Sequence, residues 1–363
     1  MDSKSINIKE QKENKYSENE KKIVNEYMNK TNHIFIKNPN FKYHSEIIKT
    51  NYPSGNNDMF EIYTSYKDNK IYIASPNYFN ANLDIFTLLD NKKVISLNAQ
   101  SSIQSVRYFY NKKNHKEYLV SQVDYDCVNI WDISDNYNFK YQFENTDQCL
   151  LIFLENNNDY IITSINMCSK YCDTSTKLYS FNDSTLIQYI NNTNDEQILY
   201  LLYWYNKNDN KNYIVQLAYG KILIHNFLEN KLYAKLVNYK YSFHQSGFIY
   251  NKDNIDYLCA SFNDVYDNGI IEIWDLYNKN IVKIFNSIGK NITCILRWND
   301  KYILFCDWKN KCVKVFDIEN KKVISSIKVE KECIRCIKKL YHPIYGESLL
   351  SADENNKIKL WII

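Results

Sequence analysis

Three arginines stand apart from the other basic residues of this sequence. Arg107, Arg297 and Arg335 occur in a chain of 363 residues that otherwise takes its positive charge from lysine. The planar guanidinium group forms paired hydrogen bonds with a carboxylate or a phosphate, whereas the lysine ammonium acts as a point charge. All three lie in segments that we expect to be inner β-strands. They are candidate residues for binding an acidic or phosphorylated partner segment; the alternative is that each pairs with a nearby acid or extends into solvent.

A second group of candidate binding residues is aromatic. They fall in segments that we expect to form loops on one rim of the fold: Tyr78, Phe79, Tyr125, Tyr171, Phe243, Tyr266 and Trp308. Exposed aromatic side chains supply a large share of the binding energy at protein interfaces. Because the chain has 33 tyrosines, an exposed tyrosine is weaker evidence for a binding site than Trp308 or Phe243.

Two pairs of cysteines have the short spacing of metal ligands. Cys333 and Cys336 fall in an expected strand, where side chains three residues apart point to opposite faces and cannot share an ion. Cys168 and Cys172 lie in an expected loop, but no second pair lies nearby to complete four ligands. We therefore expect no metal site, and we interpret Cys333 and Cys336 as buried apolar residues.

The sequence also lacks the common catalytic motifs. It has no phosphate-binding Gly-rich loop, no Gly-x-Ser-x-Gly turn and no His-Glu-x-x-His helix, and it contains six glycines in all. The six histidines are scattered along the chain. We expect a protein that is not an enzyme and binds no cofactor. The remaining alternative is a catalytic set that the fold assembles from distant segments.

The overall composition limits the class of partner. Basic and acidic residues number 45 and 42, so there is no general attraction to nucleic acid or to an anionic membrane. The ten cysteines show no repeated spacing, and there is no signal peptide and no run of about 18 apolar residues. These features favour a cytoplasmic protein that does not insert into a membrane. The abundance of Asn, Lys, Ile and Tyr is typical of an A/T-rich protist genome, and with so few Gly and Pro the turns must use Asn and Asp.

One short phrase recurs along nearly the whole chain. It is an alternating apolar strand that ends in a bulky aromatic residue or a histidine and is followed by a turn and another strand. The end residues, which we call the anchors, are Phe86, Trp131, Tyr179, His225, Trp274, Phe316 and Trp361. Successive anchors are 45, 48, 46, 49, 42 and 45 residues apart, and each interval has room for two more strands. Seven four-stranded units at this spacing predict a β-propeller.

From about residue 43 onwards the phrase resembles the WD repeat of β-transducin-like proteins. Asp132, Asp275 and Asp317 follow their anchors as in the Trp-Asp pair of that family, but its Gly-His pair is absent from every unit. The resemblance implies an all-β fold, a single seven-bladed propeller of four-stranded antiparallel blades, in a divergent member of the family. The hydrogen-bonded Asp-His-Ser-Trp network of the family is mostly missing, so we expect apolar packing to hold the blades together and the anchors to be buried structural residues.

The two ends of the repeat region predict how the ring closes. The seventh unit stops in its third strand at Ile363, so its outer strand must come from elsewhere. We expect Tyr43 to Thr50 to supply it, which gives a propeller domain over residues 43–363. Residues 1–40 are polar and lack strand alternation, which predicts a flexible tail with a candidate amphipathic helix over 18–30.

The resemblance also implies a function. Propellers of this kind commonly act as non-enzymatic scaffolds or adaptors that present their upper face to protein or peptide partners. Two alternatives stay open: a structural subunit of a large ciliary or trafficking assembly, and an enzyme with its active site at the mouth of the channel. An enzyme should gather ionisable groups with shifted pKa values at that mouth, whereas a scaffold should show an apolar, aromatic and arginine patch.

Overall fold

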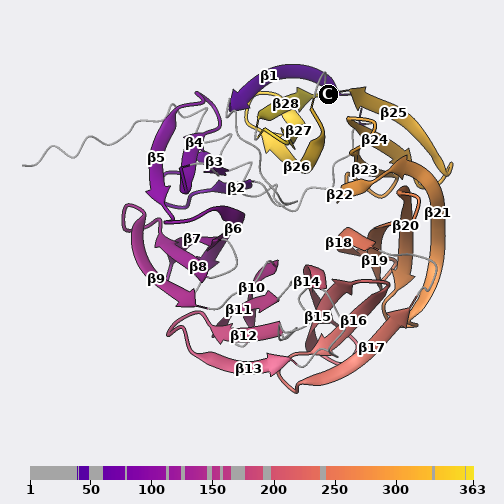
Figure 1. Cartoon of the computed structure of the whole chain (residues 1–363), viewed down its shortest axis with the longest axis horizontal. Helices are drawn as coiled ribbons and strands as arrows, with labels where there is room; N and C mark the ends of the chain where they lie inside the picture. Colours follow the sequence, from indigo (N-terminus) through magenta and orange to yellow (C-terminus); the bar gives the residue numbers. More distant parts are fainter. Residues whose placement is uncertain are drawn as a thin grey trace, which may run out of the picture.

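The fold is a ring of β-sheets. The structure, a computed structural model, describes residues 39, 41–48, 60–77, 80–111, 114–123, 127–144, 149–155, 158–164, 176–190, 198–237, 243–328, 332–355 and 357–363. Within these residues, 28 strands form seven four-stranded sheets, all with antiparallel neighbours, and there is no helix. The sheets are blades around a central axis (Figure 1). The all-β, seven-bladed propeller predicted from the sequence is confirmed.

The strands of each blade follow one another in the chain from the centre outwards, except at the point of closure. Blade 1 consists of β2 (Glu61–Thr64), β3 (Ile71–Asn77), β4 (Asn82–Thr87) and β5 (Lys93–Asn98). Blade 2 consists of β6 (Ile103–Asn111), β7 (Lys116–Val123), β8 (Cys127–Asp132) and β9 (Asn138–Glu144). Blade 3 consists of β10 (Cys149–Glu155), β11 (Asn158–Ser164), β12 (Thr176–Ser180) and β13 (Leu186–Ile190). Blades 4 and 5 consist of β14 (Ile198–Asn206), β15 (Lys211–Ala218), β16 (Lys221–Asn226), β17 (Lys231–Val237); and β18 (Phe243–Lys252), β19 (Ile255–Asn263), β20 (Asn268–Asp275), β21 (Asn280–Lys290). Blades 6 and 7 consist of β22 (Ile292–Arg297), β23 (Tyr302–Asp307), β24 (Cys312–Asp317), β25 (Lys322–Lys328); and β26 (Ile334–His342), β27 (Gly346–Asp353), β28 (Ile358–Ile362), β1 (Lys42–Ile48).

Blade 7 is built from both ends of the propeller sequence. β1 pairs antiparallel with β28, with Lys42 opposite Ile362 and Ile48 opposite Ile358. Figure 1 shows β1 as the outermost strand beside β28. The Tyr43 ring meets the Trp361 ring edge to face at 5.6 Å between centroids. The predicted closure is confirmed, and it covers an edge of β28 that would otherwise expose unpaired backbone groups.

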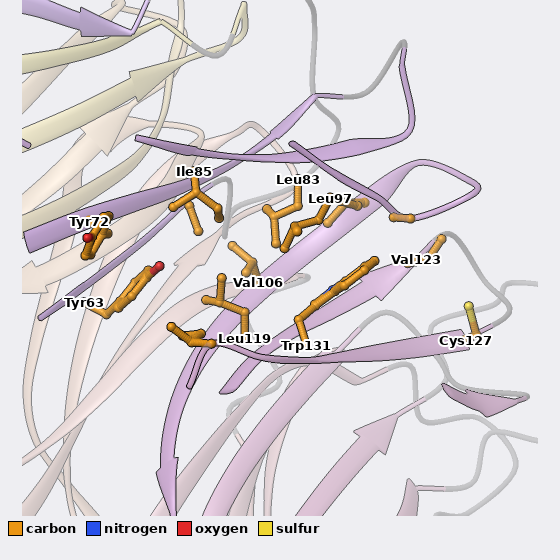
Figure 2. Close-up of a cluster of buried hydrophobic side chains, with 14 residues drawn as sticks. Tyr63, Tyr72, Leu83, Ile85, Leu97, Val106, Leu119, Val123, Cys127 and Trp131 are labelled. Atoms are coloured by element: carbon orange, nitrogen blue, oxygen red, sulfur yellow. The ribbon is translucent and has the colours of Figure 1, made fainter. Parts of the chain in front are cut away.

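Apolar packing between neighbouring blades forms the core. The described residues contain seven hydrophobic clusters, one at each interface between adjacent blades. Figure 2 shows the cluster between blades 1 and 2, where Trp131 lies beside Val106 and Leu119 of its own blade and below Leu83 and Leu97 of blade 1. The third strands β8 and β24 are buried along almost their whole length because blades cover them on both sides, whereas the outer strands β5 and β25 are largely exposed. This burial accounts for the strong apolar signal around each anchor.

Hydrogen bonds from tryptophan to serine, of the kind found in WD-repeat blades, occur in two of the blades. The indole Nε1 of Trp131 donates to Ser121 Oγ at 3.1 Å, and that of Trp361 donates to Ser351 Oγ at 2.8 Å. The tryptophan of blade 5, Trp274, donates instead to Glu272 at 2.9 Å. Two blades therefore keep a tryptophan–serine bond that the missing Gly-His pairs did not lead us to expect.

Asparagine and aspartate make many of the turns. In the described part of the chain, half of the 18 non-glycine residues with positive φ are Asn or Asp, for example Asn210 and Asp267. These two residue types tolerate the left-handed conformation because their side chains bond the local backbone. The prediction that they replace glycine in the turns is confirmed for the described residues.

Candidate binding surface

The propeller has two faces, which differ in the loops that form them. We call the face with the loops between second and third strands, and between successive blades, the upper face. The lower face carries the turns between first and second and between third and fourth strands. Each inner strand therefore runs from the upper to the lower face.

The structure does not bring the three arginines together. Arg335 is the second residue of β26 and lies at the upper face, Arg107 is at the middle of β6, and Arg297 ends β22 at the lower face. All three are in inner strands, as the sequence predicts, but at three heights along the axis. Their positions exclude a single anion site made from all three.

Arg107 lies in the central channel. Inner strands of six blades line a cavity of about 340 Å³ whose acidic and basic residues are Glu61, Arg107 and Lys338, and whose other lining residues are mostly apolar. The Lys338 Nζ and Glu61 Oε2 atoms are 3.0 Å apart, which joins the inner strands of blades 7 and 1. Arg107 Nη1 donates to the Val106 carbonyl at 3.2 Å. The charges of this cavity are thus largely engaged with the protein itself.

Arg297 is held at the lower face by its own turn. Its guanidinium pairs with Asp300, three residues later, and lies over the Tyr250 ring with 4.6 Å between the guanidinium carbon and the ring centroid. The same region contains Lys339, whose Nζ donates to the Trp298 carbonyl at 3.4 Å. Burial, reinforced by the positive charge of Arg297, lowers the pKa of Lys339 to about 8. For Arg297, the structure thus agrees with the alternative that the arginine pairs with a nearby acid of the protein itself.

Arg335 and Trp308 meet at the upper face between blades 6 and 7. The Arg335 guanidinium carbon lies 5.4 Å from the centroid of the Trp308 ring. Both side chains bond the same carboxylate oxygen: Arg335 Nη2 and Trp308 Nε1 each lie 2.9 Å from Glu354 Oε1. The Arg335 side chain remains about one quarter exposed. Two of the residues predicted for binding thus form one bonded unit, which Glu354 holds in place.

The loop between β19 and β20 presents two apolar side chains to solvent. Val265 and Tyr266 are 75% and 78% exposed, the highest fractions among the large hydrophobic side chains of the described residues. Asp264 holds the loop beneath them: one carboxylate oxygen accepts from the backbone N–H groups of Tyr266 and Asn268, and the other accepts from the Asn268 side chain, all at 2.7–2.8 Å. Burial raises the pKa of Asp264, but these hydrogen bonds outweigh it and hold that pKa below its usual value. The loop is therefore rigid although its apolar side chains are uncovered.

Ion pairing and backbone hydrogen bonds join this loop to the next blade. Lys309 Nζ lies 2.5 Å from Asp267 Oδ2, and the Trp308 amide donates to the Asn291 carbonyl at 3.2 Å. The backbone N–H of Asn291 in turn donates to the backbone carbonyl of Asp267 at 2.9 Å. The loops of blades 5, 6 and 7 are neighbours around the ring (Figure 1). We call the surface that they form the upper arc and define it by five residues: Val265, Tyr266, Trp308, Arg335 and Glu354.

For the other five aromatic residues predicted for the rim, the structure describes no side chains. Four of them lie outside the described residues: Tyr78, Phe79, Tyr125 and Tyr171. Phe243 begins β18, but only its backbone is described. Cys168 and Cys172 also lie outside the described residues, whereas Cys333 and Cys336 are buried free thiols. In the described part of the chain no group of three or more possible ligands could hold a metal ion.

Six of the seven anchors are buried side chains. They have exposed fractions of at most 7%: Trp131, Tyr179, His225, Trp274, Phe316 and Trp361. Phe86 of blade 1 is only half-buried, and it packs against the cluster between blades 7 and 1. These positions place the anchors in the blade interfaces rather than on a ligand-accessible surface.

A set of acidic residues at the lower face joins neighbouring blades. Glu117 of blade 2 accepts from three groups of the β2–β3 turn of blade 1: Ser65 Oγ at 3.0 Å, Tyr66 N at 2.9 Å and Lys67 N at 3.3 Å. Asp256 of blade 5 likewise accepts from Trp204 Nε1 of blade 4 at 3.0 Å, and Asp159 of blade 3 accepts from Asn111 of blade 2.

The sequence analysis missed these three acids. Each is the second residue of a second strand and precedes a tyrosine, in Glu117-Tyr118, Asp159-Tyr160 and Asp256-Tyr257. Burial raises the pKa of Asp256, but hydrogen bonds from Asn251, Tyr277 and Trp204 outweigh it and lower that pKa. A search for acid–tyrosine pairs at the repeat spacing would have found the positions, although not their partners.

The fold and these surfaces define the class of protein. The chain is a seven-bladed β-propeller whose architecture is consistent with that of WD-repeat proteins. No protein-family model matches the chain, and no curated protein matches it. Among the described residues, none forms a helix with the length and apolar character needed to cross a membrane.

Proposed function

We propose that this protein is a non-enzymatic interaction scaffold of the WD-repeat class, which holds a protein partner on its upper face in the cytoplasm. The upper arc is the observation that carries the proposal. It combines tyrosine, tryptophan and arginine, the residue types that contribute most at protein interfaces, on a surface held rigid by hydrogen bonds. A rigid surface loses little conformational entropy when it binds, so more of the contact energy becomes affinity.

The charges of the central channel favour a scaffold over an enzyme. In the cavity, Glu61 and Lys338 form an ion pair with each other, and Arg107 bonds its own strand. Lys339, whose pKa is lowered, bonds a backbone carbonyl near the lower face and is not among the residues that line the cavity. General acid–base chemistry needs several such groups within reach of one substrate.

Cross-linking of a native complex tests the proposal. The tagged full chain is purified from its own cells, and lysine-reactive cross-links to the proteins that copurify are mapped by mass spectrometry. We expect one partner in near-stoichiometric amount, cross-linked through Lys309 and Lys357 of the upper face. Lys67 and Lys279, in turns of the lower face, serve as the matched controls and should give few cross-links to that partner.

Two results would contradict the proposal. If no protein copurifies in stoichiometric amount, the scaffold function is wrong. If a partner copurifies but cross-links only to Lys67, Lys279 and other lower-face lysines, the scaffold function stands and the assignment to the upper face is wrong.

A further inference from the structure

The exposure of Val265 and Tyr266 needs an explanation, because their own loop gives none. Asp264 and the backbone supply the hydrogen bonds that fix the loop. The two side chains contribute almost nothing to this framework, since about three quarters of each is in contact with solvent. A partner that covers two adjacent apolar side chains removes their apolar surface from water, which is favourable.

The shape of the loop indicates the shape of the partner. Side chains exposed to 75% and 78% project from the surface rather than line a groove. Asp267 holds the loop in this position. Its carboxylate pairs with Lys309, its backbone carbonyl accepts from the backbone N–H of Asn291, and its φ of 60° is left-handed. A rigid projection of two side chains is covered most completely by a concave pocket.

The charges beside the loop indicate the polarity of that pocket. Asp264 is bonded within the loop, Asp267 pairs with Lys309, and Glu354 pairs with Arg335. Each of these acids already has hydrogen-bond or ion-pair partners within the protein, which leaves the two exposed apolar side chains as the feature that a partner can still cover. A partner that meets this surface gains by burying apolar area and gains little from net charge.

We infer that the β19–β20 loop inserts Val265 and Tyr266 into an apolar pocket of a folded partner protein, with the Trp308–Arg335 pair of the upper arc at the edge of the contact. The inference rests on the proposed function and identifies the element that the partner recognises. Glu354 bonds both Trp308 and Arg335 and so fixes how the two side chains are oriented. Arg335 is therefore a positioning residue, which acts on the partner through the orientation of the Trp308–Arg335 pair. A two-fold dimer centred on this loop would set one projection against another, which leaves the two side chains of each copy uncovered.

Hydroxyl-radical footprinting of the purified complex tests the inference. The oxidation rate of Tyr266 is compared between the free full chain and the complex that copurifies from cells. Tyr219 is the matched control, since it is a 45% exposed tyrosine in the corresponding upper-face loop of blade 4. We expect Tyr266 to be protected at least about fivefold in the complex and Tyr219 to change less than about twofold, because a buried ring loses its access to solvent.

Variants of the same two residues provide a second measurement. Tyr266→Ala should weaken binding of the purified partner by about 30-fold, the change typical of an interface hot spot, whereas Tyr219→Ala should change it less than about threefold. Arg335→Lys should have a smaller effect than Tyr266→Ala, with Arg297→Lys of the lower face as its control. Binding should persist at 0.5 M salt, because burial of apolar surface is not screened.

The outcomes separate this inference from the proposed function. A partner that cross-links to the upper face but leaves Tyr266 unprotected, or binds Tyr266→Ala as well as the parent, overturns the inference and leaves the scaffold function intact. Release of the partner by 0.5 M salt also overturns it, since the contact is then electrostatic and an acidic or nucleic-acid partner fits better. Absence of any stoichiometric partner overturns both.

Discussion

The lower face of blades 1 and 2 and the upper arc are both rich in aromatic side chains, but the two regions use them in opposite ways. At the lower face the rings pack against each other: Tyr63 stacks on Tyr108 with 4.9 Å between centroids, and Tyr66 stacks on Tyr110 with 4.0 Å. The hydroxyl of Tyr108 donates to Glu117, the acid that also bonds the turn of blade 1.

In the upper arc Asp264 bonds its own loop and Glu354 bonds both Arg335 and Trp308, whereas no acid among the described residues bonds the Tyr266 ring, which is left uncovered. Asp264 fixes its loop while Tyr266 remains exposed. The comparison shows that the number of aromatic residues in a region does not distinguish a structural cluster from a binding surface. The distinction lies in which groups the nearby acids bond, and that depends on the position of each acid relative to the turn.

Several changes test this difference between structural groups and exposed side chains. Removal of β1 should have the largest effect on stability. Deletion of residues 1–38 keeps β1 and should leave a soluble protein that melts cooperatively. Deletion of residues 1–55 exposes the edge of β28 and should cause loss of cooperative melting and aggregation, measured by calorimetry and size-exclusion chromatography. Equal melting temperatures for the two truncations would mean that closure by β1 contributes nothing to stability.

Glu117→Gln should have the next largest effect. The glutamine amide keeps one acceptor oxygen and replaces the other with an NH2 group, so two of the four donors, either Ser65 and Lys67 or Tyr66 and Tyr108, lose their acceptor. Hydrogen bonds to a charged group contribute about 1.5–3 kcal/mol each, so we expect a loss of roughly 3–4 kcal/mol in the free energy of unfolding, measured by urea titration. The control is Glu229→Gln, which removes an exposed ion pair with Lys211 and should leave the free energy of unfolding almost unchanged, because water screens exposed charges. Similar losses in the free energy of unfolding for the two variants would show that Glu117 does not hold blades 1 and 2 together.

His342 should make stability depend on pH in mildly acidic solution. Its buried ring accepts from the backbone N–H groups of Ile344 and Tyr345 through Nδ1, and burial, with a smaller contribution from His44, lowers its pKa to about 4. The unfolded chain binds this proton below a pKa of about 6.5, so stability rises with pH between 4 and 6.5 and is fully present above that window. Acidification from pH 7 to pH 4 should therefore cost up to about 3 kcal/mol.

The variant His342→Asn isolates this effect. Its side-chain oxygen replaces Nδ1 as an acceptor and does not titrate in this range, so the difference between parent and variant should shrink as the pH falls from 6.5 to 4. Urea titrations at several pH values measure it. Parallel stability curves for the two proteins would assign the acid sensitivity to other groups.

The smallest effects distinguish the two kinds of exposed tyrosine. Tyr66 is 52% exposed and stacks on Tyr110, so Tyr66→Ala should cost about 1 kcal/mol of stability. Tyr266→Ala should change stability by less than about 0.5 kcal/mol, because its ring makes few contacts. The measurement is thermal unfolding of the two purified variants. A larger loss for Tyr266→Ala would show that its loop depends on the ring and would place Tyr266 with the structural group.

Much of the fold could be predicted because each blade is a local unit of consecutive strands. The spacing of the anchors predicted seven blades of four strands each, and the structure has seven four-stranded sheets. The site could be predicted only in part. The interest in Arg335 and Trp308 came from residue type, but nothing in the sequence paired them or distinguished Arg335 from Arg297.

The sequence alone determined the number of blades, the closing strand and the use of Asn and Asp in turns, because these depend on local periodicity and turn chemistry. The tertiary structure decided which acids join blades, which arginines face which rim and which aromatic rings remain uncovered. Glu117 and Ser65 are 52 residues apart in the chain, and Trp308 and Glu354 are 46 apart. Such contacts depend on the height of each residue along its strand and on the angle between adjacent blades. A repeat of about 45 residues brings many side chains to each interface, and only the three-dimensional packing selects the pairs that meet.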